Sequence, residues 1–214
     1  MALGPGLDLE FGVGGSLAWN LYLHSQGQVA HARSQTEAAL VKDLGVRSLI
    51  SSLGGVYARS VAGVEPNPYL SHLPYRDYKI DEGPILTLVN SSYFMRLLHE
   101  HEADQFRAKV RGHVTSLRPL REENRLDEWE RRALIAFHEG ETEVAEVVEE
   151  EGKRAFRLMR PRYADEGCLG CHNKQGYQAG GVLGGVSISV PLSDAAGISD
   201  NRRVIALILG HTFL

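Results

Sequence analysis

Both cysteines of the chain lie in one short stretch, Cys168-Leu-Gly-Cys-His172. Two cysteines separated by two residues cannot tie distant segments together, as a disulfide framework does. The fold must therefore be stabilised by a hydrophobic core. A chain of 214 residues with 43% hydrophobic residues is long enough to bury one. These totals predict one domain, or at most two small ones.

The charge composition narrows the range of partners. The formal net charge is −4 and the isoelectric point lies near 6.1. Proteins that bind nucleic acid usually present a strongly basic surface, so the charge argues against such a partner. Cysteine usage alone leaves the cellular compartment open.

Three stretches carry apolar residues at intervals of three and four, which is typical of helices. The first is long, over residues 16–52. The second covers residues 91–106 and opens with serines that can cap a helix. The third covers residues 124–140, where Trp129 lies among the apolar residues of one face and is interpreted as a core residue.

Alternating apolar residues predict strands between these helices. The predicted strands are residues 54–61, 83–90, 112–120, the two arms of a hairpin over 141–163, and 180–194. Residues 65–78 are dense in proline, asparagine and tyrosine and are predicted to form a loop. The sequence therefore predicts an α+β fold with a central, largely antiparallel sheet, a long N-terminal helix and flanking helices.

Both ends of the chain differ from the central part. In residues 202–214, RRVIALILGHTFL, two arginines precede an apolar run. We interpret this run as the beginning of a membrane-spanning helix, and the alternative is a C-terminal helix of the core. No stretch reaches the roughly 18 apolar residues of a complete span. Residues 1–15 are rich in glycine and lack the basic start of a signal peptide, so we interpret them as a tag or a membrane-proximal remnant.

The cysteine stretch has the form C-x-x-C-H, which is the attachment site of a c-type haem. The two thiols, Cys168 and Cys171, can add to the two vinyl groups of one porphyrin. The adjacent imidazole of His172 is then held under the ring as a ligand of the iron. Gly167 and Gly170 allow the backbone to lie close to a flat macrocycle.

Three other interpretations of the stretch compete with haem attachment. A thioredoxin-like redox pair would lie in a βαβ unit, which the predicted element order lacks. A structural zinc ion usually takes four ligands, and no second Cys/His pair follows at short spacing. A disulfide across two residues is strained and rare. The sequence favours one covalently attached haem c.

Six blocks of the chain, between about residues 19 and 192, occur in the same order as the blocks of a known family. These blocks are GGVYARSV, PNPYLSHL, ILTLVNSSYFMRLLHE, GHVTSLRPLREENRLDEWERRAL, RPRYADEGCLGCH and GGVLGGVSISVPL. In this order they resemble a bacterial family of periplasmic c-type-haem sensor domains with a PAS-like fold, which form the sensor parts of membrane-bound signal transducers.

The resemblance implies a domain organisation and a location. It implies a PAS-like haem-c sensor domain over residues 16–192, followed by a C-terminal helix over residues 193–214 that enters the membrane. It also implies a periplasmic location, in a protein that is flanked by membrane segments and able to form a homodimer.

The second axial ligand of the iron decides what such a haem can sense. Met95 lies in a block shared with the family and is the preferred candidate, although a buried methionine is commonly a core residue. His113 is the alternative, and an open site is a third arrangement. His99, His101 and His138 are expected to face solvent. The remaining histidines, His24, His31, His72 and His211, are expected on the surface.

Haem propionates require cations or hydroxyl groups as partners. Arg96, Arg118 and Tyr57 are the candidates from the shared blocks, although a surface arginine commonly forms only a weak ion pair. Tyr69 and Tyr177 are candidates for covering the edge of the ring, and such aromatic residues are more commonly part of the core.

The sequence thus predicts a sensor domain rather than an enzyme. We expect it to respond to redox state or to a diatomic gas such as NO or CO through a change in axial ligation, and to pass this change to a signalling module. The alternative is a periplasmic mono-haem cytochrome with an electron donor and acceptor as partners. Such a carrier would be smaller and mostly helical.

Overall fold

The computed structural model describes residues 5–106, 110–119, 121–150, 152–164, 168–169 and 175–192, with the backbone alone for residues 5–14, Leu17 and Phe106. The fold is α+β, as predicted, and its long N-terminal helix and antiparallel sheets are consistent with a PAS-like fold. Cys171, His172 and the predicted C-terminal helix lie outside the described residues.

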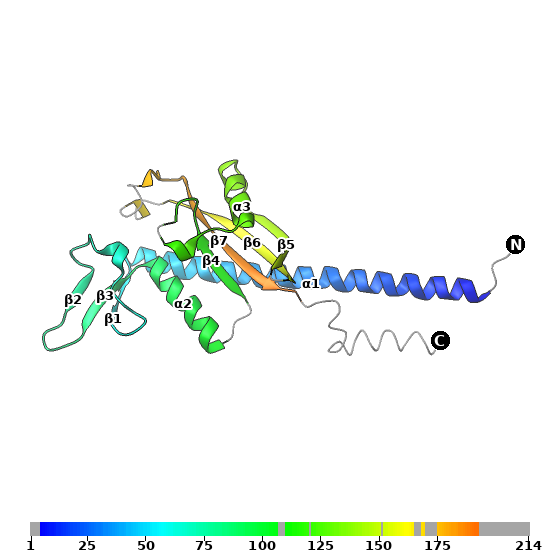
Figure 1. Ribbon diagram of the computed structural model, residues 1–214, viewed down its shortest axis with the longest axis horizontal. Helices are drawn as coiled ribbons and strands as arrows, with labels where there is room; N and C mark the ends of the chain where they lie inside the picture. The colour runs from blue at the N-terminus through cyan, green and yellow to red at the C-terminus, as the bar shows by residue number, and fades with distance from the viewer. Residues whose placement is uncertain are drawn as a thin grey trace.

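The longest element is helix α1, Pro5–Ser52, which runs the length of the molecule in Figure 1. It begins earlier than the predicted residue 16. Its first half extends beyond both sheets, and its second half packs against the rest of the domain. The buried positions are Ala32, Thr36, Leu40, Asp43, Arg47 and Ile50, spaced by three or four residues. Two of these six are charged, which an apolar pattern does not reveal.

Four strands form the larger antiparallel sheet, in the order β4-β7-β6-β5. The strands are β4 (Arg111–Thr115), β5 (Val144–Glu150), β6 (Lys153–Tyr163) and β7 (Val182–Pro191). β5 and β6 form the predicted hairpin, and β6 and β7 pair along most of their length. A Cβ atom at Gly184 would collide with the backbone of Thr115 in β4, so glycine is required for this close pairing.

The two faces of this sheet are covered by different helices. On one face, Leu158 of β6 and Ile188 of β7 pack with Leu40 of α1. On the other face, Met159 packs with Trp129 of helix α3, Glu128–His138. Trp129 is therefore a core residue, as predicted. Neighbouring residues of β6 point in opposite directions, so one strand contributes to both cores.

A second sheet of three strands lies near the end of α1, at the left of Figure 1. Its order is β1 (Val56–Arg59), β3 (Ile85–Val89) and β2 (Asp77–Lys79), with both pairs antiparallel. The sequence predicted a single central sheet and placed β2 in a loop. β2 was missed because three residues are too short to show alternation.

The remaining elements are short helices. Helix α2 spans Ser91–Phe106, as predicted, but its cap is the side chain of Asn90, which accepts a hydrogen bond from the Tyr93 backbone at 2.9 Å. A 3₁₀ turn covers Pro68–Leu70. The predicted helix over 124–140 begins later, as α3, because Asp127 caps it and forms a capping box with Glu130; a 3₁₀ turn, Glu122–Asn124, precedes it. Within the described residues, no helix is long and apolar enough to span a membrane.

Candidate functional site

A cavity of about 690 Å³ lies between α1, α2, β4 and the loops that contain residues 65–70 and 116–124. Binding pockets for cofactors commonly have volumes of roughly 300–1,000 Å³. We call it the α2–β4 cavity. Its wall combines apolar side chains, such as Met95 and Leu183, with several arginines and histidines.

The segment that carries the C-x-x-C-H motif is held at the α2–β4 cavity on both sides. Before the motif, Arg162 of β6 lines the cavity. After it, Tyr177 lines the cavity, and Gln175 exchanges hydrogen bonds of 2.9 and 3.0 Å with Arg118. Cys168 is half-buried and lies near Arg47, whose pKa responds to a charge on the Cys168 sulfur. The described chain before and after the motif thus reaches the wall of the cavity.

Of the other predicted site residues, Met95, Arg96, Arg118 and His113 line the α2–β4 cavity. Met95 projects from α2 and is 2% exposed. Arg96 stacks over the ring of Tyr93 at 4.3 Å and lies 3.7 Å from Glu100. These residues come from different segments of the chain, and the fold brings them to one wall.

Tyr57 does not line the α2–β4 cavity. It is 40% exposed on β1, where its hydroxyl donates to the carbonyl oxygen of Tyr75. Its ring contacts Tyr78 edge to face, with the ring centroids 5.1 Å apart. Tyr57 therefore belongs to an aromatic cluster on the small sheet. Tyr69 and Tyr177, which the sequence suggested as ring covers, do line the cavity.

His99 was expected to face solvent, and this expectation is wrong. Its Nε2 lies 2.8 Å from Asp43 Oδ2 of α1, and its side chain is only 21% exposed. The imidazole ring lies over Gly112, where any Cβ atom would collide with it. Burial alone would raise the pKa of Asp43, but the hydrogen bonds and charges of His99 and Lys42 together outweigh it and lower that pKa. The pair joins the cavity wall to α1.

Arg47 was not among the predicted site residues, yet it lines the α2–β4 cavity from the buried face of α1. Burial lowers its pKa to about 9, and the nearby charge of Arg162 acts in the same direction. The available signal was a pair of charges, Asp43 and Arg47, at helical spacing on the face that carries Leu40. Charges on a buried helix face usually have a structural or functional partner.

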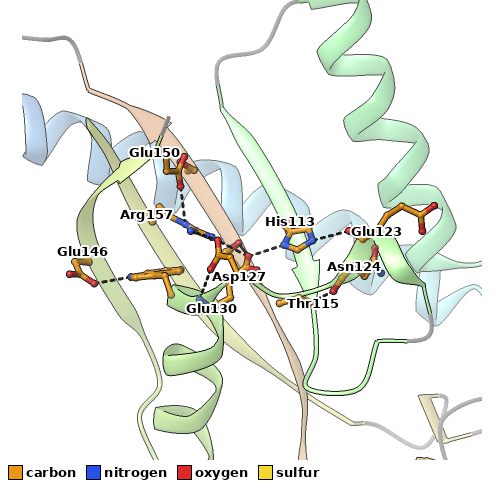
Figure 2. Close-up of polar contacts among 12 residues, drawn as sticks. His113, Thr115, Glu123, Asn124, Asp127, Glu130, Glu146, Glu150 and Arg157 are labelled. Carbon is orange, nitrogen blue, oxygen red and sulfur yellow. Dashed lines mark hydrogen bonds and ion pairs between the residues drawn. The ribbon is translucent and has the colours of Figure 1, made fainter. Parts of the chain in front are cut away.

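A buried polar network adjoins the cavity at His113 (Figure 2). His113 Nδ1 lies 2.8 Å from Glu130 Oε1, and the Glu130 side chain is 1% exposed. Ser187 donates to the same oxygen at 2.6 Å, and Arg157 Nη2 lies 3.2 Å from it. Burial is the largest single effect and would raise the pKa of Glu130, but the hydrogen bonds to Glu130 and the charge of His113 together outweigh it and lower that pKa. Glu130 is therefore an ionised residue inside the domain.

The hydrogen bond to Glu130 raises the pKa of His113 above the ordinary 6.5, although burial opposes it. A raised pKa contributes stability that is complete below about pH 6.5 and is lost as the pH rises through the folded-state value. We therefore expect the free energy of unfolding to fall as the pH rises above about 6.5 and through the raised folded-state pKa of His113. His113→Gln should flatten this fall in urea unfolding curves.

The matched control for this measurement is His72→Gln, because His72 is exposed. That variant should keep the pH dependence of the parent protein. An equal slope in the His113→Gln variant and in the parent would contradict the prediction.

The donor set of the α2–β4 cavity fits a porphyrin. The wall offers a buried thioether, Met95, and several cations, and Cys168 lies near Arg47 of this wall. Among the described residues, no cluster of three or more His, Cys, Asp or Glu side chains is arranged to hold a bare metal ion. The arrangement suits a bound ring with acidic substituents.

Comparison with known proteins identifies the family. Residues 26–191 match the Tll0287-like family. The matched residues run from the middle of α1 to the end of β7. No curated protein and no solved structure matches the chain. The chain therefore belongs to the Tll0287-like family, a family of periplasmic haem sensor domains.

Proposed function

We propose that the chain is a periplasmic sensor domain with one haem c, which is bonded through Cys168 and Cys171 and ligated by His172. The supporting observation is that the chain reaches the α2–β4 cavity on both sides of the motif: Arg162 lines it before the motif, and Gln175 exchanges hydrogen bonds with Arg118 after it. A ring attached at the motif would enter that cavity.

The residues of the cavity wall have distinct roles in this proposal. Met95 places a thioether at the cavity, where it is available as the second axial ligand. Arg96 and Arg118 provide cations for acidic substituents. When bound, haem supplies a one-electron redox centre and, where the second ligand is labile, a site for a diatomic gas. The apolar side chains of the wall, such as Met95 and Leu183, would limit the access of water to a bound ring.

The contacts between α2 and α1 provide a path for the signal. Met95 and His99 belong to α2, and His99 bonds to Asp43 of α1. One turn further, Lys42 Nζ lies 2.8 Å from Glu102 Oε1. A change in the ligation of Met95 would shift α2, and these polar contacts would transmit the shift to α1. Two states with different ligand affinity or redox potential are required for such a response.

The test is to produce the protein in a host that attaches c-type haem and to examine it after denaturation. We expect the pigment to remain bonded to the chain, and Cys168→Ser with Cys171→Ser to remove it. Absorption spectra of the ferrous protein with NO and with CO then show whether the second axial site opens. A pigment that separates on denaturation would contradict the attachment. If the ferrous protein binds neither gas and its reduction potential matches an iron with two permanent axial ligands, the electron-transfer cytochrome is favoured.

Replacing Met95 by Leu tests the second ligand while preserving side-chain volume. We expect the variant to lose the spectral signature of thioether ligation, to lower its reduction potential and to bind CO in the ferrous state, because a Met ligand raises the potential of a haem. The control is Met159→Leu, since Met159 is fully buried against α3 on the other side of the larger sheet. Identical spectra for Met95→Leu and the parent would exclude Met95.

A further inference from the structure

Arg47 differs from three of the other arginines that line the α2–β4 cavity, Arg96, Arg118 and Arg121. Among the described residues, five arginines line it: Arg47, Arg96, Arg118, Arg121 and Arg162. Arg96 and Arg121 each lie within 4 Å of a glutamate, and Arg118 donates to a backbone carbonyl. Arg47 is 7% exposed, and its hydrogen bond is to the neutral hydroxyl of Ser92, at 3.1 Å.

The surroundings of Arg47 disfavour its charge. Arg162, which also lines the cavity, repels it and lowers its pKa. The nearest negative charge on its own helix is Asp43, whose carboxylate is already bonded to His99. In the part of the chain that the structure describes, no carboxylate lies within ion-pair distance of Arg47. A buried cation without a counterion costs free energy, and removing it can increase stability.

We propose that Arg47, together with Ser92 and close to Arg162, forms a carboxylate-binding subsite in the wall of the α2–β4 cavity. Arginine is suited to a carboxylate because its guanidinium can form two parallel hydrogen bonds to the two oxygens. The ligand's negative charge would relieve the repulsion between the two arginines. The Ser92 hydroxyl would add a third donor on the α2 side.

The carboxylate has two potential sources. A haem bonded to Cys168, which lies near Arg47, would bring its propionates close to the subsite. This source rests on the proposed function. A free small carboxylate that enters the cavity has the same chemistry and does not require haem. The experiment therefore has one arm for each source.

The first measurement uses the full chain produced without haem, and compares the thermal midpoints of the parent, Arg47→Met and Arg47→Lys. We expect Arg47→Met to unfold at the same temperature as the parent or at a higher one, because it removes a buried charge without a counterion. A lower midpoint for Arg47→Met would mean that the arginine stabilises the fold, and it would overturn the proposal.

The second measurement uses the haem-loaded protein. We expect Arg47→Met to shift the propionate bending mode in resonance Raman spectra and to lower the reduction potential, because a nearby cation disfavours the oxidised, more positive haem. Arg47→Lys should preserve most of the potential. Arg131→Met is the control, since Arg131 is exposed on α3 and does not line the cavity.

The third measurement adds sodium acetate to each protein and follows its thermal midpoint. If a propionate occupies the subsite, acetate should stabilise the haem-free parent but not the haem-loaded one. If the propionate mode is unchanged in Arg47→Met and acetate stabilises the haem-loaded parent but not this variant, the ligand is a free carboxylate. If acetate binding and the propionate mode are both unchanged in Arg47→Met, the proposal is wrong.

Haem attachment is tested separately, by denaturation of the protein. A colourless parent protein would contradict the proposed function, and the acetate measurement would still test the subsite.

Discussion

Replacing Arg157 by Met should lower the free energy of unfolding by about 3–5 kcal/mol. Arg157 is 7% exposed and lies among three carboxylates, with distances of 2.6 Å to Asp127, 3.2 Å to Glu130 and 3.3 Å to Glu150. Its guanidinium also lies 4.3 Å from the centre of the Trp129 ring. Its removal would leave the buried Glu130 with less positive charge, and an uncompensated buried carboxylate is costly.

Urea unfolding at neutral pH measures this loss, and three comparisons make it specific. The loss should shrink at about pH 4, because an unpaired Glu130 can take up a proton. The double variant Arg157→Met with Glu130→Gln should cost less than the sum of the single variants, since the two groups interact directly. Arg132→Met, at an exposed arginine of α3, should stay within about 0.5 kcal/mol of the parent. A cost below about 1 kcal/mol for Arg157→Met would contradict the structural assignment.

Replacing Leu158 by Ala should destabilise the domain by about 2–5 kcal/mol. Leu158 is fully buried in β6 and packs in the core between the larger sheet and α1. The substitution removes apolar contacts and leaves a cavity that the flanking strands can fill only in part. Since Leu40 of α1 belongs to the same core, amide hydrogen exchange near Leu40 should also become faster.

The matched control for Leu158→Ala is Val41→Ala. Val41 is 61% exposed on the outer side of α1, so this variant should change the free energy of unfolding by less than about 0.5 kcal/mol. Equal effects of the two substitutions would show that the larger sheet does not pack on α1 as described. If Leu158→Ala destabilises the domain but leaves exchange near Leu40 unchanged, Leu158 does not couple the sheet to α1.

Local sequence patterns predicted most of the secondary structure because they depend on neighbouring residues. The serine-rich start and the helical spacing of residues 91–106 matched α2 at both ends. The alternation of residues 141–163 matched the β5–β6 hairpin, which turns beside Gly152. The predicted helix over 124–140 was too long at its start, because the capping role of Asp127 depends on a reciprocal contact with Glu130.

The candidate site was predicted less completely. Met95, Arg96, Arg118 and His113 were chosen from shared blocks, and all four line the α2–β4 cavity. Tyr57 was chosen in the same way and lies instead in the aromatic cluster of the small sheet. A block shared with a family indicates that a segment matters to the fold or the site, but it does not indicate which way a side chain points.

The sequence by itself determined the α+β class, the succession of helices and strands, and a two-thiol motif suited to a covalent haem, because these are properties of adjacent residues. Only the tertiary structure decided that there are two sheets, that His99 bonds to Asp43 across 56 residues, and that Ser187 reaches Glu130 across 57. It also placed Arg47 beside Arg162 at the cavity. Charges of this kind acquire their partners, or lack them, only when distant segments pack together and exclude water.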